Sequence, residues 1–362
     1  MPRVHSRALR SPMMLSLLLF ALAGATTPGA PAAASACAAV EAVSRDEAAR
    51  FAPPASVDST GALPDTDAEL SIEATRRRDR SLARLEAIRS AAGAGRLTRS
   101  DALARSASRH AAYLSANGLH STPSIHAEAA GLAGFTGADP FVRMRAAGFR
   151  SSYGTEVIGD VMRAANDGDC VDRLMNTVYH AALLLSRVTQ VGAAYGDGPA
   201  AGVCVIDLGA PLGSPETEVP ASGELVRYPW PGMTVPTGTF LPGSENPRPP
   251  AALLPGATAG VPVLVGLRNA DGLAQDPGAA LVQVQVFELL DDGNVPVPSV
   301  VLADIAIVGP GMVPDKALHG AFAVLVPRQP LRPGRYRVIL HATIGSGHVL
   351  APAPWEFSVA DR

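Results

Sequence analysis

His126, Glu156 and His180 are the residues of this chain whose types and order could build a chemical site. Two neutral imidazoles and a carboxylate can bind Zn²⁺ and leave one coordination position open. The same groups could instead transfer protons as an acid–base pair. No HExxH helix motif fixes a metal geometry, and no serine or cysteine nucleophile stands out. Zinc or another divalent metal is therefore a hypothesis, no cofactor is certain, and it stays open whether the protein is an enzyme.

Other residues compete for places in this site. His120 lies in the same loop as His126, and either histidine could instead be an exposed loop residue. Glu128 and Asp172 are candidates for a second acid. Glu156 lies next to Val157 and Ile158, so we expect it to be partly buried, and burial by itself raises the pKa of a carboxyl group.

Apolar periodicity predicts the elements that would position these residues. Leu82, Leu85 and Ile88 form one face of a helix that ends at Gly93, and Thr98 with Asp101 predicts a capping box for the next helix. The other expected elements are a helix capped by Asp139 with Pro140 at its first position, an apolar helical stripe over 171–178, and strands over 188–195 and 201–208.

The pattern changes after residue 223, where prolines become frequent and helical periodicity disappears. Alternation of apolar and polar residues is clear in LVQVQVFELL and WEFSV. Six strands are expected, over 261–267, 281–290, 297–302, 321–326, 335–343 and 355–359. This rhythm of short strands predicts an all-β Ig-like sandwich domain.

Five segments between Leu82 and Gly209 carry a resemblance to a known family. They are 82–114, NGLHSTPSIHAE (117–128), GTEVI (154–158), YHAALLL (179–185) and VGAAYGDGPAAGVCVIDLG (191–209). The stretch resembles the CAP superfamily (cysteine-rich secretory, antigen 5, pathogenesis-related 1), in its bacterial secreted branch. The resemblance implies an α+β, α-β-α sandwich domain with His, Glu and His in one cleft.

The resemblance also assigns roles to single residues. It favours His126 over His120, because a Gly-rich loop and a Pro-x-x-Arg helix follow His126. Glu156 matches the glutamate of the family's Gly-Glu-Asn-Ile motif, with Val157 in place of the asparagine. His180 matches the histidine of a Ser-Pro-x-His-Arg stretch, although the neighbouring residues differ. Arg143 is expected to brace the cleft.

The amino terminus is typical of an export signal, with arginines before the apolar run MMLSLLLFALAGA and small residues after it. We expect a signal peptide over 1–36, a leader over 37–75, the CAP-like domain over 76–212, a linker over 213–223 and the Ig-like domain over 224–362. The expected location is secreted or periplasmic, with no membrane span in the mature chain. A lipid anchor on Cys37 is disfavoured, because the residues before it make a poor lipobox. Cys170 and Cys204 could form a disulfide in an oxidising compartment.

Composition limits the function further. The net charge is −3 and no basic patch is dense enough to suggest nucleic acid. The leading hypothesis is an exported protein that acts at or near the cell envelope by binding a lipid, a glycan or a divalent metal in the His/Glu cleft. A secreted, metal-assisted hydrolase of peptides or cell-wall material is the alternative, and a structural adhesion protein is a third reading.

Overall fold

The computed structural model describes residues 72–119, 121–160, 169–196, 203–211, 225–267, 282–318, 321–344 and 347–361. The expected signal peptide, Cys37, His120 and the expected linker over 213–223 lie outside these residues. No helix within them is long and apolar enough to cross a bilayer.

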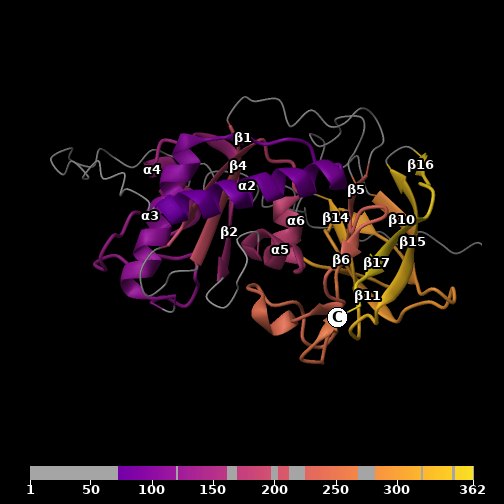
Figure 1. Ribbon diagram of the computed structural model, residues 1–362. Coiled ribbons are helices and arrows are strands. Elements are labelled where there is room, and N and C mark those ends of the chain that lie inside the picture. Colours follow the sequence, from indigo (N-terminus) through magenta and orange to yellow (C-terminus); the bar gives the residue numbers. More distant parts are fainter. Residues whose placement is uncertain are drawn as a thin grey trace, which may run out of the picture. The chain divides into compact units, whose positions relative to one another are not determined.

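The amino-terminal region of the described chain is built on a four-stranded sheet (Figure 1). Its strand order is β1-β3-β4-β2, in which β1 pairs parallel with β3 while β4 pairs antiparallel with both β3 and β2. The strands are β1 (Thr98–Arg99), β2 (Ser151–Asp160), β3 (Gln190–Tyr195) and β4 (Val203–Pro211). The strand pair expected around residues 188–208 is confirmed.

Among the described residues, five helices accompany this sheet: α2 (Ile72–Ala92), α3 (Asp101–Asn117), α4 (Pro140–Ala146), α5 (Asp169–Met175) and α6 (Tyr179–Leu184). Asp139 caps α4 by accepting from the N–H of Val142, with Pro140 in the first turn, as the sequence predicts. The capping box expected at Thr98 is wrong. Ser100 is the N-cap of α3, and Thr98 pairs with β3 instead.

Alternating side chains of the sheet face two different layers. On β3, Val191 and Ala193 join the core that contains Leu85 and Ile88 of α2, while Ala194 joins the core beneath α3. Because successive residues of a strand point to opposite faces, the sheet separates α2, α5 and α6 from α3. This is a three-layer α-β-α arrangement.

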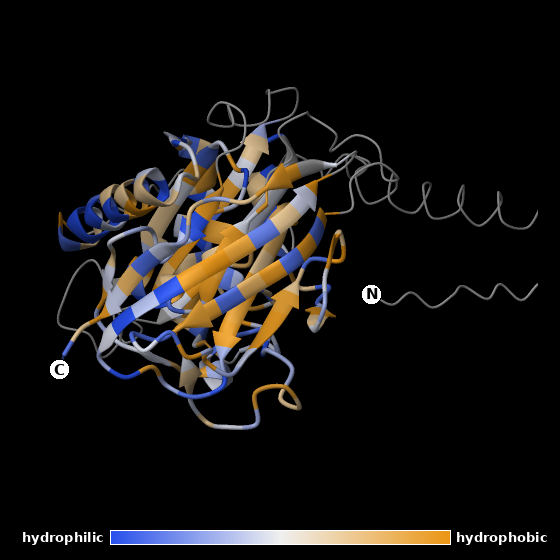
Figure 2. Ribbon diagram, turned by 90° about the vertical axis from the view of Figure 1, so that its right-hand side faces the viewer, coloured by the Kyte–Doolittle hydropathy of each residue, from blue (hydrophilic) through white to orange (hydrophobic). Residues whose placement is uncertain are grey.

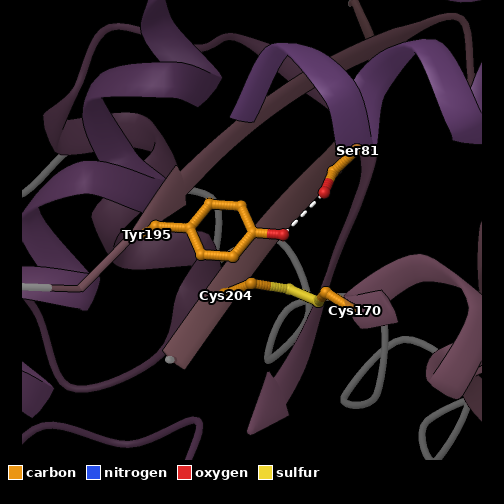
Figure 3. Close-up of a disulfide and its surroundings, with 4 residues drawn as sticks. All are labelled: Ser81, Cys170, Tyr195 and Cys204. Carbon is orange, nitrogen blue, oxygen red and sulfur yellow. Dashed lines mark hydrogen bonds between the residues drawn. A yellow bond between two sulfur atoms is a disulfide. The ribbon is translucent and has the colours of Figure 1, made fainter. Parts of the chain in front are cut away.

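A disulfide between Cys170 and Cys204 ties α5 to β4 in this region (Figure 3). The two Cα atoms are 6.6 Å apart, and both side chains are buried. Beside the disulfide, the hydroxyl groups of Ser81 on α2 and Tyr195 on β3 share a hydrogen bond of 2.6 Å. Side-chain bonds thus connect this face of the sheet to both α2 and α5.

Replacing both Cys170 and Cys204 with alanine should lower the free energy of unfolding by about 2–4 kcal/mol, because the bridge restrains the unfolded chain between residues 34 positions apart. Urea unfolding of the two oxidised proteins measures this difference. A reducing agent should lower the midpoint of the wild type and leave the double variant unchanged. Equal midpoints of the two oxidised proteins would contradict the prediction.

The carboxyl-terminal region is rich in strands, and all six expected strands are present. The described elements are β5 (Val226–Tyr228), β6 (Thr234–Val235), β7 (Thr239–Phe240), η2 (Pro242–Ser244), β8 (Ala259–Gly260), β9 (Val263–Gly266), β10 (Val282–Leu290), β11 (Ser299–Ala303), β12 (Ile307–Val308), β13 (Met312–Pro314), β14 (Phe322–Pro327), β15 (Gly334–Ile344), β16 (His348–Leu350) and β17 (Trp355–Val359). Figure 2 looks onto this region and shows hydrophilic and hydrophobic bands alternating along its strands.

These strands form two larger sheets and one small one. The first sheet has the order β12-β10-β15-β17-β6, with β16 also paired to β15, and the second has the order β13-β11-β14-β9-β5. Strands β7 and β8 pair separately. Apolar residues of this region, such as Leu264 and Val324, belong to the same continuous core as Leu85 of α2.

Candidate functional site

Glu156 lies at the centre of a buried charged cluster in the amino-terminal region. It is on β2, and its side chain is fully buried. The guanidinium group of Arg143 on α4, itself buried, donates to both of its carboxylate oxygens, at 2.9 and 2.8 Å. A two-point contact of this kind combines charge attraction with a fixed geometry. Arg143 therefore holds Glu156 in place, while its expected role in bracing the cleft stays a prediction.

Arg143 also holds the loop before α4. Its Nη1 donates to the backbone carbonyl of His126 at 3.0 Å and, at 3.4 Å, to that of Gly137. One side chain thus fixes the position of Glu156 and the backbone path of the loop that carries His126.

His126 is the member of the cluster that solvent can reach. Its Nδ1 lies 2.9 Å from a carboxylate oxygen of Glu156, and 23% of its side chain is exposed. An ionised carboxylate can only accept, so Nδ1 must be the donor in this bond. In the neutral ring Nε2 is then an acceptor, and no hydrogen bond to it is formed by the described residues. The structure therefore brings together two of the predicted site residues, with one ring nitrogen left for a ligand.

Glu128 supports the cluster from within. Its carboxylate accepts from the backbone N–H groups of Thr136 at 2.6 Å and Gly137 at 3.2 Å. It also pairs with Nδ1 of His110 at 2.9 Å, while Nε2 of His110 lies 3.0 Å from the carbonyl oxygen of Ile125. Both side chains are buried. Glu128, a candidate second acid, is therefore committed to holding the loop and His110.

Two opposing effects set the acidity of Glu156. Burial alone would raise its pKa, but the hydrogen bond from His126 and the electrostatic attraction of the His110, Arg143 and His126 side chains hold the pKa of Glu156 below its ordinary value of 4.5. Glu156 is thus an ionised anchor at neutral pH and a weak proton acceptor.

His180 has different partners. It is buried near the start of α6, with its Nδ1 3.4 Å from Glu245 and 3.3 Å from the hydroxyl of Thr177. Glu245 belongs to the strand-rich region and also accepts from the backbone N–H groups of residues 178, 179 and 180. None of the described contacts joins His180 to His126 or Glu156. Sequence patterns gave no indication of Glu245.

The remaining candidates are dispersed. Asp172 forms an ion pair with Arg84 of α2 at 2.8 Å and has no described contact with the cluster. Within the described ranges, no three His, Cys, Asp or Glu side chains are grouped so that they could hold a metal ion. Since Arg143 already neutralises Glu156, this arrangement suits an acid–imidazole pair better than a metal centre. The proposed metal set of His126, His180 and Glu156 stays a prediction.

Asp207 is a member of the cluster that the sequence analysis missed. It lies directly opposite Glu156 in the β2–β4 register and is fully buried. On its other side it pairs with Gly192 of β3, where a Cβ atom would lie 2.0 Å from the backbone nitrogen of Ala104, so glycine allows α3 to cover the sheet closely. An acid inside the apolar strand VCVIDL was the available signal.

Comparisons with known proteins agree with this architecture. Residues 82–208 match the model of the CAP family, described as the cysteine-rich secretory protein family. No curated protein matches the chain. The matched segment contains α3, α4, strands β1 to β3, most of β4 and the cluster around Glu156. Residues 82–208 of this chain are therefore a CAP domain.

Proposed function

We propose that the CAP domain binds a ligand through the imidazole of His126, in an exported protein that acts at or near the cell envelope. The observation that carries the proposal is the state of this side chain, which is partly exposed while Glu156 and Arg143 hold it from within. A ring fixed before the ligand arrives loses little conformational freedom on binding. His126 therefore presents a preorganised hydrogen-bonding nitrogen.

Segments that follow His126 in the sequence favour a ligand with an apolar part. The loop that follows it and helix α4 expose four large apolar side chains: Leu132, Phe135, Phe141 and Val142. A contiguous apolar patch commonly marks a binding surface, and we propose that these four side chains form one. A lipid, with an oxygen-rich head near His126 and its chains against this surface, fits better than a glycan or a lone metal ion.

Other parts of the chain support the cellular setting. The basic, apolar and small-residue zones of residues 1–36 favour export to the periplasm or the exterior, and the matching segments favour a bacterial secreted branch of the family. We assign residues 224–362 to an Ig-like sandwich domain, since their two larger sheets supply the layers of that architecture.

The test uses the mature chain and vesicles made from bacterial envelope phospholipids. His126→Ala should weaken vesicle binding at least tenfold, equivalent to about 1.4 kcal/mol, because the oriented imidazole is lost. His341→Ala removes an exposed histidine of β15 and should leave the affinity unchanged. If the wild type does not bind these vesicles, or if both variants bind equally well, the proposal is wrong.

A hydrolase is the second candidate, because a carboxylate-oriented histidine can also act as a general base. In that case His126 would take the proton, since Glu156 is held ionised by Arg143. Turnover of peptide or cell-wall fragments that is lost in His126→Ala would favour this alternative over simple binding.

A further inference from the structure

Asp207 lies opposite another acid, and its carboxyl oxygens have no hydrogen-bond partner among the described residues. It faces Glu156 across the β2–β4 pair, and both side chains lie on the face of the sheet that α3 covers. Neither carboxyl oxygen of Asp207 accepts a hydrogen bond from a described residue, and the buried hydroxyl of Ser106 on α3 also has no partner. A buried, ionised carboxylate in this position would be costly.

The charges around Asp207 are already balanced. Arg143 from α4 and His110 from α3 are the surrounding cations, while Glu156 from β2 and Glu128 from the loop are the anions, and His126 completes the group. Arg143 donates to Glu156 and to backbone carbonyls, and both nitrogens of His110 face acceptors. The hydrogen bonds that these cations donate thus go to partners other than Asp207, and the remaining Nε of Arg143 lies 3.7 Å from a carboxylate oxygen of Glu128.

We propose that Asp207 is protonated at neutral pH and acts as a positioning residue of the His126 site. Once protonated, its O–H can donate to the carboxylate of Glu156, which faces it across the β2–β4 pair. Two facing carboxyl groups can form a hydrogen bond only when one of them carries a proton. Because Arg143 and His126 bond to Glu156, the proton resides on Asp207.

The electrostatics agree with this geometry. Burial, followed by the negative charge of Glu156, raises the pKa of Asp207 well above its ordinary value of 3.8, and the opposing effects of Ser106 and Arg143 are smaller. Asp207 thereby supports the carboxylate that orients His126 without adding a second negative charge. The effect of Asp207 on ligand binding rests on the proposed function. The protonation of Asp207 does not depend on that function.

A raised pKa has a definite consequence for stability. Between the ordinary pKa and the raised one, the folded chain keeps a proton that the unfolded chain releases. The stability that Asp207 contributes is therefore complete below its ordinary pKa and is lost as pH rises toward the folded-state value. Asp207→Asn, which keeps a neutral donor at this position, should become more stable relative to the wild type as pH rises.

The test follows the aspartate carboxyl carbons of the ¹³C-labelled mature chain by NMR from about pH 5 to pH 8, without ligand. One carbon should keep the chemical shift of a protonated carboxyl across this range, and its signal should be missing from Asp207→Asn. Asp304→Asn is the matched control. Asp304 is also buried, but it accepts from the backbone N–H groups of Ala306 and Ala321, so replacing it should leave the protonated signal in place.

Glu156→Gln provides an independent assignment if Asp207→Asn does not fold. Without the neighbouring negative charge, the protonated signal should titrate at lower pH than in the wild type. The inference is overturned if the carboxyl carbons of all aspartates have the chemical shifts of ionised groups at pH 7. It is also overturned if the protonated signal is still present in Asp207→Asn, or if it titrates in Glu156→Gln as it does in the wild type. Failure of vesicle binding would leave these signals unchanged, so the two proposals fail separately.

Discussion

Replacing Arg143 with methionine is expected to lower the free energy of unfolding by about 3–5 kcal/mol. Methionine fills much of the same space but leaves Glu156 without its two-point partner, and the carbonyl of His126 loses its donor. Removing one member of a buried ion pair strands the other charge in a medium that solvates it poorly. Urea unfolding of the mature chain at neutral pH measures the loss.

Two further variants separate the ion pair from other effects of the change. Arg150→Met alters an exposed arginine that follows the same helix and should change stability by no more than about 0.5 kcal/mol. The double variant Arg143→Met with Glu156→Gln removes both charges and should recover part of the loss. If the double variant is as unstable as the sum of the single variants, the pair is not coupled and the explanation is wrong.

The same pair should make stability depend on pH. Because the pKa of Glu156 is lowered in the folded protein, its stabilising contribution is present above the ordinary value of 4.5 and is lost as pH falls through the folded-state value. Glu156→Gln should therefore show a weaker loss of stability in acid than the wild type. If the free energy of unfolding of Glu156→Gln falls with decreasing pH as steeply as that of the wild type, this assignment is wrong.

Replacing Glu245 with alanine is expected to lower the free energy of unfolding by about 3 kcal/mol or more, because it removes the acceptor of three backbone N–H groups at the start of α6. A buried donor left without a partner costs about 1–3 kcal/mol. His180 also loses the carboxylate that lies 3.4 Å from its ring. We therefore expect the turn before α6 to separate from the strand-rich region.

Hydrogen exchange gives the local measurement for this variant. The amides of Val178, Tyr179 and His180 should exchange much faster in Glu245→Ala, whereas those of β10 should be unaffected except through global unfolding. Glu288→Ala changes an exposed acid on β10 and serves as the control. Unchanged protection at residues 178–180 would show that Glu245 does not hold this turn.

Much of the fold could be predicted because the relevant information is local. The helical spacing of Leu82, Leu85 and Ile88, the cap at Asp139 and the alternation in β10 and β17 all reflect periodicity or turn chemistry within a few residues. The wrong prediction of a cap at Thr98 also concerns residues that lie close together in the sequence. Ser100 and Thr98 are both suitable caps, and only the pairing of Thr98 with β3 decides between them.

By itself, the sequence determined the succession of helices and strands, the resemblance to the CAP superfamily and the importance of His126 and Glu156. The tertiary structure alone decided which charges meet. It placed Asp207 opposite Glu156 through strand register, committed Glu128 to His110, and gave His180 the acid Glu245 from the strand-rich region. Periodicity reports which face of an element is buried, but ion pairs form between residues far apart in the sequence, such as Arg84 and Asp172, which are 88 positions apart. Their partners follow from register and packing, which no local pattern encodes.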